Sequence, residues 1–341
     1  MQYKVTIGIP VFRVENYIKR TMESVLSQSY PDIEFLVIDD GSDDKSLEIL
    51  TTIQQTHPRG KDIRILSHEL NQGVSVTRNQ IIDEAKGDFL YFVDSDDIID
   101  RNTISLLMSQ IVEHQADIAF GSYERIELSG NSSLFQYPKM LFDNADTFAD
   151  FAYQKYAGFQ ASACNYLVKL SLIRQNNLRF FKSDFWEDMV FTLHLVTIVE
   201  RAVLLPDITY TYLCRENSLS NSWHHGQIPK EKIIQYFGAV ELLKLGKDKY
   251  FQKVYYPNRC YIAVMSDFYI ICNVLKKYEF IIPNFTNAEL HRFMRHPASF
   301  KEVLAFKRNR IKNLLFWGLG ELPSSLGILL VKIIAKYKGL K

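Results

Sequence analysis

The sequence predicts an α/β protein in which a doubly wound, mostly parallel sheet is followed by a helical C-terminal extension. In the first 120 residues, short apolar runs alternate with segments of helix length, and this alternation is typical of parallel βαβ units. The runs are apolar almost without interruption, as strands buried on both faces are. After Pro229 the chain becomes helical and rich in tyrosine.

The elements of the first 120 residues can be placed one by one. Val5, Ile7 and Ile9 form a β-type run that ends at Pro10. Glycine commonly ends a helix, and Gly87 is expected to end the helix of residues 73–86. The expected strands cover residues 5–10, 33–38, 63–66, 89–93 and 117–121. The expected helices between them cover residues 14–29, 44–56, 73–86 and 101–115.

The periodicity is less regular beyond residue 121, and residues 122–145 have the character of strand and loop. The expected elements that follow are helices at 146–157, 166–176 and 187–201, a strand at 203–213, and helices at 230–247 and 258–277. The weakest patterning lies near residues 220–230. We therefore expect a sheet domain of residues 1–225 and a helical region of residues 226–341.

The composition excludes several classes of protein. Hydrophobic residues make up 47% and charged residues 23% of the 341 positions, which is ordinary for a globular protein and not for a disordered, collagen-like or coiled-coil chain. The 40 basic and 39 acidic residues are nearly balanced, which argues against a nucleic-acid-binding protein. The four cysteines show no CxxC spacing, so we expect four free thiols in a reducing compartment rather than a zinc site.

Polar clusters follow four of the expected strands, at the point where each strand ends. They are Pro10-Val11-Phe12, Asp39-Asp40-Gly41-Ser42, Asn71-Gln72-Gly73 and Asp94-Ser95-Asp96-Asp97. Each alone could be an ordinary turn, since Asp, Asn and Gly favour turns. All four fall on one edge of a parallel sheet, however, which is where open α/β sheets bind ligands.

The cluster Asp94-Ser95-Asp96-Asp97 predicts a cation site. Three carboxylates within four residues repel one another unless a cation lies among them. Oxygen ligands of this kind suit Mg²⁺ or Mn²⁺. Because one or two carboxylates leave positions for water and phosphate oxygens, the pattern fits a substrate that carries a diphosphate.

Other nucleotide and metal motifs are missing from the sequence. It has no GxxxxGK[ST] loop and no GxGxxG after the first strand, which argues against a P-loop enzyme and a nicotinamide dehydrogenase. It has no HExxH motif, and the doublet His224-His225 is poorly spaced for one metal ion.

The ordered set of motifs resembles that of family 2 glycosyltransferases of the GT-A fold, of the inverting type that builds bacterial surface polysaccharides. The resemblance is close over residues 4–110 and continues more thinly through Phe185-Trp186-Glu187-Asp188 and Tyr212 to Ser220. The segments that carry it are 5–12, Val37 to Ser42, Asn71-Gln72-Gly73 through Thr77-Arg78-Asn79, and Phe92 to Asp97. It makes residues 1–225 a nucleotide-sugar-binding and catalytic domain.

The resemblance implies a binding role for particular residues. Asp40 would bind the edge of the uracil base, with Asp39 behind it. Arg78 would lie beside the nucleotide, and Asp94 would contact the ribose. Asp96, with Asp94, would ligate the Mn²⁺ or Mg²⁺ ion that bridges the two phosphates. The nucleotide-sugar-binding set is Pro10, Val11, Phe12, Glu15, Asp39, Asp40, Asn71, Gly73, Arg78, Asp94, Ser95, Arg215, Ser218 and Ser220. Of these, Arg215, Ser218 and Ser220 resemble the segment that closes over the diphosphate.

The resemblance also implies the catalytic residues. Glu187-Asp188 is similar to the family's acidic pair, in which Asp188 would be the general base. A base that takes the acceptor's proton, with no protein nucleophile, gives inversion at the anomeric carbon. An acidic pair at a helix N-terminus can also simply stabilise the helix dipole.

The C-terminal tail differs in charge from the rest of the chain. Residues 301–341 hold nine basic and two acidic residues, a net charge of +7, so the other 300 residues carry −6. Apolar positions fall on one helical face, as basic amphipathic membrane-surface helices have them; they are 326, 329, 330, 333, 334 and 337. The alternative is a terminal helix that docks on the protein's own body.

We therefore expect an inverting, metal-dependent glycosyltransferase that uses a nucleotide sugar, with UDP as the favoured nucleotide. The expected partners are that donor, a glycan or lipid-linked glycan acceptor and an anionic membrane surface; no nucleic acid is expected, and a homo-oligomer is left open. With no export signal and no run of 18 apolar residues, we expect a cytoplasmic protein, peripheral at the inner face of the plasma membrane. A sugar-nucleotide pyrophosphorylase and a non-catalytic sugar-nucleotide-binding or scaffold protein are the alternatives.

Overall fold

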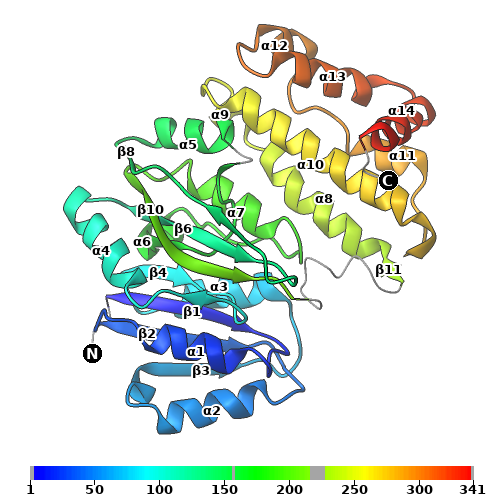
Figure 1. Cartoon of the computed structure of the whole chain (residues 1–341). Coiled ribbons are helices and arrows are strands. Elements are labelled where there is room, and N and C mark those ends of the chain that lie inside the picture. Colours follow the sequence, from blue (N-terminus) through cyan, green and yellow to red (C-terminus); the bar gives the residue numbers. More distant parts are fainter. Residues whose placement is uncertain (1–3, 156–157, 216–226, 339–341) are drawn as a thin grey trace.

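A computed structural model describes residues 4–155, 158–215 and 227–338 of the protein (Figure 1). Within them the chain forms a large mixed sheet followed by a helical C-terminal region. The strand order is β3-β2-β1-β4-β9-β6-β10-β5, with β7 beside β6 and β8 beside β10. The predicted mixed α/β class, mostly parallel sheet and helical extension are confirmed.

The first four sheet positions are parallel and follow the prediction closely. The pairs β1–β2, β2–β3 and β1–β4 are all parallel, and β1 and β2 are buried along their whole length. The strands are β1 (Val5–Val11), β2 (Ile33–Asp39), β3 (Ile63–Ser67) and β4 (Phe89–Phe92). Helices α1 (Ile18–Leu26), α2 (Ser46–Thr56) and α3 (Val74–Glu84) connect them.

The first helix is shorter than predicted because its expected first turn is held by side chains. The backbone N–H of Val14 donates to Ser46 Oγ, and that of Glu15 donates to Asp44 Oδ2. These bonds fix residues 14 and 15 against the start of α2, so α1 begins only at Ile18.

The second half of the sheet contains the main departure from the prediction. Residues 166–169, expected to begin a helix, form strand β9 (Tyr166–Lys169), antiparallel to both neighbours β4 and β6. Buried Tyr166, Leu167 and Val168 fill the space between those strands. The helix α6 (Leu170–Gln175) starts only after them. An inserted antiparallel strand of four residues leaves too short a pattern to distinguish from a helical one.

Most of the remaining elements of the sheet domain lie near their predicted positions. The remaining elements are β5 (Ile98–Ile99), α4 (Thr103–His114), β6 (Ile118–Ile126), β7 (Ser132–Phe135), β8 (Met140–Phe142), α5 (Ala145–Gln154), α7 (Glu187–Leu195) and β10 (Ala202–Leu213). The two-residue strand β5 was not predicted, and β7 and β8 fall in the region expected only to be strand and loop. Helix α7 begins at the predicted residue but ends at Leu195 instead of residue 201, because a turn precedes β10.

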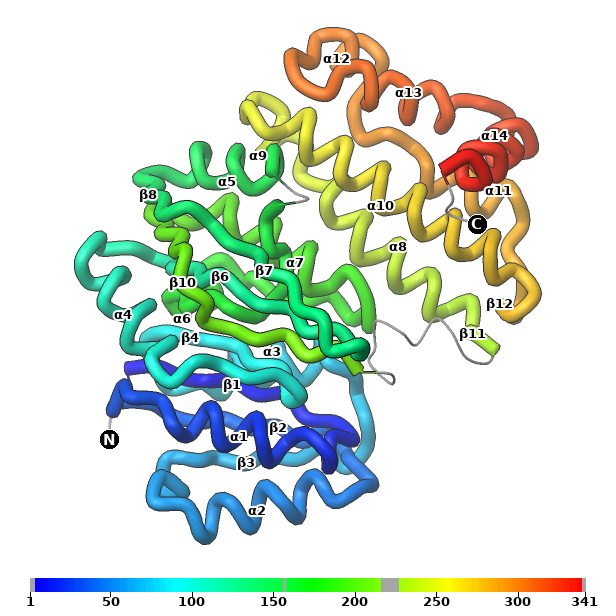
Figure 2. Tube along the Cα trace, viewed as in Figure 1, coloured from blue at the N-terminus to red at the C-terminus, as the bar shows by residue number. Residues whose placement is uncertain are grey.

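The helical region packs against the sheet domain through α8 and α10 (Figure 2). Helix α8 (Lys230–Lys244) contacts α7, and α10 (Tyr256–Lys276) contacts α5. The other elements are β11 (Ile228–Pro229), α9 (Lys247–Tyr250), β12 (Ile281–Ile282), α11 (Asn287–Arg292), α12 (Phe300–Ala305), α13 (Arg310–Glu321) and α14 (Ser324–Tyr337). The boundary predicted at residues 225 and 226 falls at the edge of a segment outside the described residues.

Two smaller expectations about the chain can be compared with the structure. All four cysteines are free thiols, as expected. Among the described residues, none of the helices has both the length and the apolar character needed to cross a bilayer.

Candidate active site

The predicted clusters at the strand ends meet around one cavity of about 690 Å³. Sequence-predicted residues that line it are Pro10, Val11, Phe12, Asp40, Asn71, Gly73, Arg78, Asp94, Ser95, Asp96 and Arg215. The carboxyl ends of β1, β2 and β4 therefore form one edge of the cavity, as the strand-end argument predicts.

From the cluster that follows β2, Asp40 reaches the cavity and holds the loop before α3 in place. Asp40 is buried, and its carboxylate accepts hydrogen bonds from the backbone N–H groups of Gln72 (2.9 Å) and Gly73 (2.8 Å) and from His68 Nδ1 (2.6 Å). Gly41 has φ +72°, and a Cβ there would lie 2.7 Å from the backbone of Leu70. A glycine thus lets the two loops approach each other closely.

His68 was not predicted, although it stands directly after β3 on the same edge of the sheet. Its ring contacts Asp40 through Nδ1 and Gln80 Oε1 through Nε2. Burial alone would lower the pKa of His68, but the hydrogen bonds to Asp40 and Gln80 raise it above its usual value. Both ring nitrogens are engaged, one by Asp40 and one by Gln80, so the ring holds the Asp40 carboxylate in place.

The acidic cluster after β4 has one buried carboxylate and two at the cavity. Asp97 is fully buried and accepts from Tyr210 Oη (2.7 Å) and from the backbone N–H of Leu213 (2.9 Å). Burial, and then repulsion from Asp96 and Asp94, raise the pKa of Asp97 well above its usual range. Asp97 therefore anchors the loop, while Asp94 and Asp96 line the cavity.

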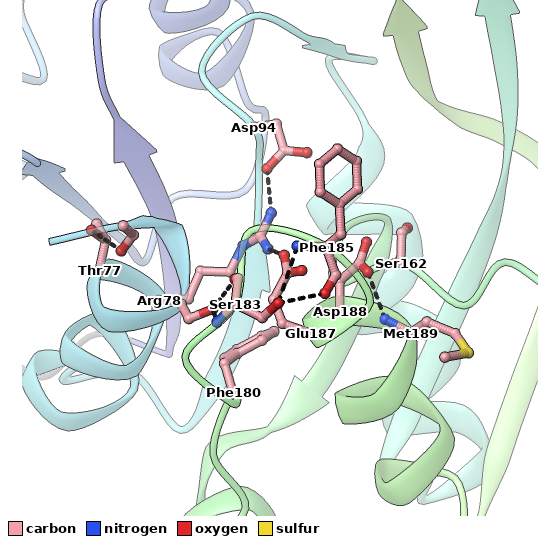
Figure 3. A network of polar contacts seen from close by, with 12 residues as sticks. Thr77, Arg78, Asp94, Ser162, Phe180, Ser183, Phe185, Glu187, Asp188 and Met189 are labelled. Atoms are coloured by element: carbon pink, nitrogen blue, oxygen red, sulfur yellow. Dashed lines mark hydrogen bonds and ion pairs between the residues drawn. The ribbon is translucent and has the colours of Figure 1, made fainter. Parts of the chain in front are cut away.

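Arg78 connects the cavity to the acidic pair at the start of α7 (Figure 3). Its guanidinium is buried between Asp94 Oδ1 (2.9 Å) and Glu187 Oε1 (3.0 Å). Burial would lower the pKa of Arg78, but the two carboxylates raise it above its usual value. Arg78 stays charged and couples Asp94 electrostatically to Glu187.

Glu187 and Asp188 occupy an unusual helix N-terminus. Trp186, just before α7, has φ +71°, a conformation that costs a bulky residue energy and often marks functional sites. Burial, followed by repulsion from Asp188, raises the pKa of Glu187 to about 8. Burial also raises the pKa of Asp188, whose Oδ1 accepts from the Met189 N–H at 2.6 Å.

Several predicted residues lie outside the cavity lining. Glu15 accepts from the backbone N–H of Lys45, and Asp39 accepts from that of Ser42. Glu187 and Asp188 lie behind Arg78, close to Phe185 and Met189 (Figure 3). Ser218 and Ser220, which were predicted to bind the diphosphate, lie outside the described residues, as does the doublet His224-His225.

Six residues line the cavity without having been predicted as site residues: Arg13, Val74, Thr77, Asp184, Tyr212 and Lys232. Asp184 and Lys232 are the two that form an ion pair with each other, at 2.7 Å. Asp184 precedes the acidic pair, and Lys232 comes from α8 in the helical region. Proximity to the acidic pair could have indicated Asp184. No sequence signal indicates Lys232, because only the packing of α8 against α7 brings it to the cavity.

The chain has carboxylates that fit a divalent cation. In the described parts of the chain, no group of three or more His, Cys, Asp and Glu side chains is arranged to hold one. Asp94 and Asp96 both line the cavity, each paired with an arginine through one oxygen, Asp94 with Arg78 and Asp96 with Arg215. Two carboxylates are enough when water and substrate phosphates complete the shell, as is usual for Mg²⁺.

The sequence of this chain matches the model of a known protein family. Residues 6–167 match the model described as glycosyl transferase family 2. This segment of the chain is therefore similar to the family 2 glycosyltransferases. This confirms the resemblance found in the motifs, and the match runs from β1 into β9.

Proteins similar to this chain in sequence are also named glycosyltransferases. The chain is 34% identical to glycosyltransferase GlyA of Streptococcus pneumoniae over 228 residues, 64% of this chain but only 32% of GlyA. It is 26% identical over 278 residues to the GalNAc(5)-diNAcBac-PP-undecaprenol beta-1,3-glucosyltransferase of Campylobacter jejuni. That match covers 78% of this chain and 84% of the relative.

A solved structure has a similar fold over both the sheet domain and the helical region. S. aureus TarS 1–349, in complex with UDP-GlcNAc, superposes with a TM-score of 0.60 at 18% identity, covering 93% of this chain and 90% of that one. The predicted GT-A fold class is therefore confirmed, including the helical C-terminal region.

Proposed function

We propose that the protein is an inverting, metal-dependent glycosyltransferase that moves a sugar from a UDP-sugar to a hydroxyl of a glycan or lipid-linked glycan. The observation that carries the proposal is the buried bridge from Asp94 at the cavity through Arg78 to Glu187. This bridge links the cavity, where Asp94 is suited to a metal ion and a diphosphate, to the acidic pair at the start of α7, which is suited to act as a base. The match to the family 2 model and the relatives named glycosyltransferases support the same reaction class.

The cavity has the charges that a nucleotide diphosphate requires. Arg78, Arg215 and Lys232 line it as cations, and the oxygens of Asp94 and Asp96 are suited to a divalent ion. The ion, when bound, neutralises charge on the departing diphosphate. Arg215 pairs with Asp96 in this structure, so it is placed to turn from that carboxylate to a phosphate and stabilise the same charge.

Asp188 is the proposed general base, and Glu187 is its nearest substitute. Glycosyl transfer to a hydroxyl requires a group that removes the proton, and such a group works best when its pKa lies near the working pH. Burial shifts both carboxyls in that direction. Asp184, next to the pair in sequence, lines the cavity, so an acceptor bound there would lie beside the start of α7.

The choice of UDP and of a lipid-linked acceptor is part of the proposal. TarS was crystallised with UDP-GlcNAc, and the Campylobacter relative is named for an acceptor glycan carried on undecaprenol. Such acceptors are made at membranes, so we also propose that the protein works at the inner face of the plasma membrane.

The alternatives have less support from the residues present. A pyrophosphorylase would need a glycine-rich basic loop after β1, whereas Arg13 there is exposed and paired with Asp43. A scaffold that only binds sugar nucleotides would need no acidic pair, and here Glu187 is buried against Arg78.

The proposal is tested by incubating the full chain with a panel of UDP-sugars and Mn²⁺ or Mg²⁺ and measuring released UDP. We expect slow release from at least one donor, and its loss on adding EDTA. Donors can be ranked beforehand by thermal shift, since a tight ligand stabilises the folded state. Binding of UDP-sugars with no release, with or without glycan acceptors, would favour the scaffold; pyrophosphate release from UTP and a sugar phosphate would favour the pyrophosphorylase.

A further inference from the structure

Helix α14 has two apolar faces, and only one of them is packed against the protein. Gly327, Ile328, Val331 and Ala335 are buried, and the helix contacts α10 and α11. Gly327 lies so close to the ring of His291 that a Cβ there would come within 2.5 Å of it. This contact fixes which side of the helix faces the body.

The other face leaves large apolar side chains in solvent. The exposed fraction is 43% for Leu326, 51% for Leu329, 54% for Ile333 and 88% for Tyr337. Their spacing of three, four and four residues places them along one side of the helix. This is the face that the sequence pattern singled out, and it is not the face that docks.

Basic side chains accompany the exposed apolar face. Lys332 and Lys336 are exposed on α14 and Lys338 just beyond it, and the helix contains no acidic residue. The preceding helix α13 repeats the combination, with Ile311 and Leu315 exposed by 73% and 69% next to exposed Lys312.

We propose that this outer face of α14, formed by Leu326, Leu329, Ile333 and Tyr337 with Lys332 and Lys336, binds the surface of an anionic lipid bilayer. An interfacial helix buries its apolar side at the boundary between headgroups and acyl chains, while lysines at its edges meet anionic headgroups. With 14 residues the helix is about 21 Å long, too short to span a hydrocarbon core of about 30 Å. Its docked face also ties it to the body, so it lies on the membrane.

A second copy of this chain is a poorer occupant of the same face. Pairing two identical α14 faces would bring Lys332 and Lys336 of each copy close to those of the other, with no carboxylate on either helix to offset them. An anionic membrane supplies the charge that such a pair would lack. Membrane binding by α14 does not depend on the proposed function. Only its purpose does, which is to bring the cavity close to lipid-linked acceptors.

The test is flotation of the full-length chain with vesicles of phosphatidylcholine alone and with 30% phosphatidylglycerol. We expect binding to the anionic vesicles that weakens as salt rises, because salt screens the lysines, with some apolar attachment remaining. The double variant Leu329→Ser/Ile333→Ser should lose at least nine-tenths of the bound fraction. Lys332→Ala/Lys336→Ala should reduce binding at low salt and flatten the salt dependence.

A matched control exists on the sheet domain, where Leu134 and Leu141 are exposed to a similar extent. The double variant Leu134→Ser/Leu141→Ser should bind vesicles like the unaltered chain. The inference is overturned if the unaltered chain does not float with anionic vesicles. It is equally overturned if Leu329→Ser/Ile333→Ser keeps the melting temperature of the unaltered chain and floats to the same extent as that chain. It is also overturned if sedimentation shows a dimer that Leu329→Ser/Ile333→Ser converts to monomer. UDP release without vesicles, measured in parallel, reports on the proposed function separately.

Discussion

Arg78 and Arg259 are both buried, one beside the cavity and one where the helical region meets the sheet domain, yet their surroundings are opposite. Arg78 lies between the carboxylates of Asp94 and Glu187. Arg259 donates to uncharged acceptors, Tyr153 Oη at 2.6 Å, His194 Nε2 at 2.9 Å and the Leu242 carbonyl, and its guanidinium stacks on the ring of Tyr250.

The difference indicates that the buried Arg78 serves the active site, whereas the buried Arg259 serves the stability of the fold. Beside Arg78, burial raises the pKa values of Glu187 and Asp188, so protons and ligands can change the balance of charge there. Around Arg259 burial and the positive charge lower the pKa of His194 to about 3, so the imidazole stays neutral and accepts the hydrogen bond. We expect substitutions near Arg78 to alter activity, and those near Arg259 to alter stability.

The largest effect on activity is expected at the cavity carboxylates. Asp96→Ala or Asp94→Ala should reduce UDP release below detection and abolish metal-dependent UDP binding, because these are the carboxylates proposed to hold the ion. The melting temperature should change little. Asp207→Ala, at an exposed acid, is the control, and near-normal turnover of Asp96→Ala with the same metal dependence would refute the metal assignment.

The next effect separates the two members of the acidic pair. Asp188→Asn should leave donor binding nearly unchanged and lower kcat by about 10²–10⁴-fold, the usual contribution of a general base. Steady-state kinetics with donor and acceptor measure it. A loss below tenfold, together with a large loss in Glu187→Gln, would move the role of base to Glu187.

The helical side of the comparison is tested by Arg259→Met. The substitution leaves the buried groups Tyr153 Oη and His194 Nε2 without their donor, which should lower the free energy of unfolding by about 3 kcal/mol. The kcat of the protein that remains folded should fall less than threefold. Urea unfolding measures the first quantity, with Arg101→Met at an exposed arginine as control. A steep loss of kcat with unchanged stability would erase the distinction between the two regions.

The same two regions should give stability opposite dependences on pH. The pKa of Glu187 is raised, so the stability linked to it is complete below about pH 4.5 and is lost as pH rises towards 8. The pKa of His194 is lowered, so its contribution is complete above about pH 6.5 and is lost as pH falls towards 3. Urea unfolding across this range should show that Glu187→Gln flattens the alkaline limb and His194→Gln the acid limb. Unchanged limbs in both variants would contradict these pKa directions.

The smallest effect is expected at Lys232, which the helical region contributes to the cavity. Its side chain is 35% exposed and already paired with Asp184, so water screens much of its attraction for a diphosphate. Lys232→Met should raise the KM for the donor about two- to fivefold without changing kcat. Lys276→Met, exposed at the end of α10, should leave both constants unchanged, and a hundredfold loss at Lys232 would make this residue part of the catalytic machinery.

The sequence was informative where local patterns carry the structure. The edge formed by Pro10, Asp40, Asn71 and Asp94 could be predicted because strand ends and turn residues are local signals, and parallel strands end on the same side of a sheet. Strand β9 could not, since it becomes a strand only by filling the gap between β4 and β6. Lys232 and Arg259 depend on how distant helices pack. For α14 the pattern indicated the exposed apolar face, but small residues such as Gly327 and Ala335 made the docked face.

Asp97 does not line the cavity, but it connects two segments that do. Its two carboxylate oxygens are held by Tyr210 and Leu213 of β10, while its neighbour Asp96 faces Arg215, two residues after that strand ends. One side chain therefore holds together two parts of the cavity wall, the loop after β4 and the end of β10. These two parts of the wall cannot separate unless the hydrogen bonds of Asp97 to Tyr210 and Leu213 break.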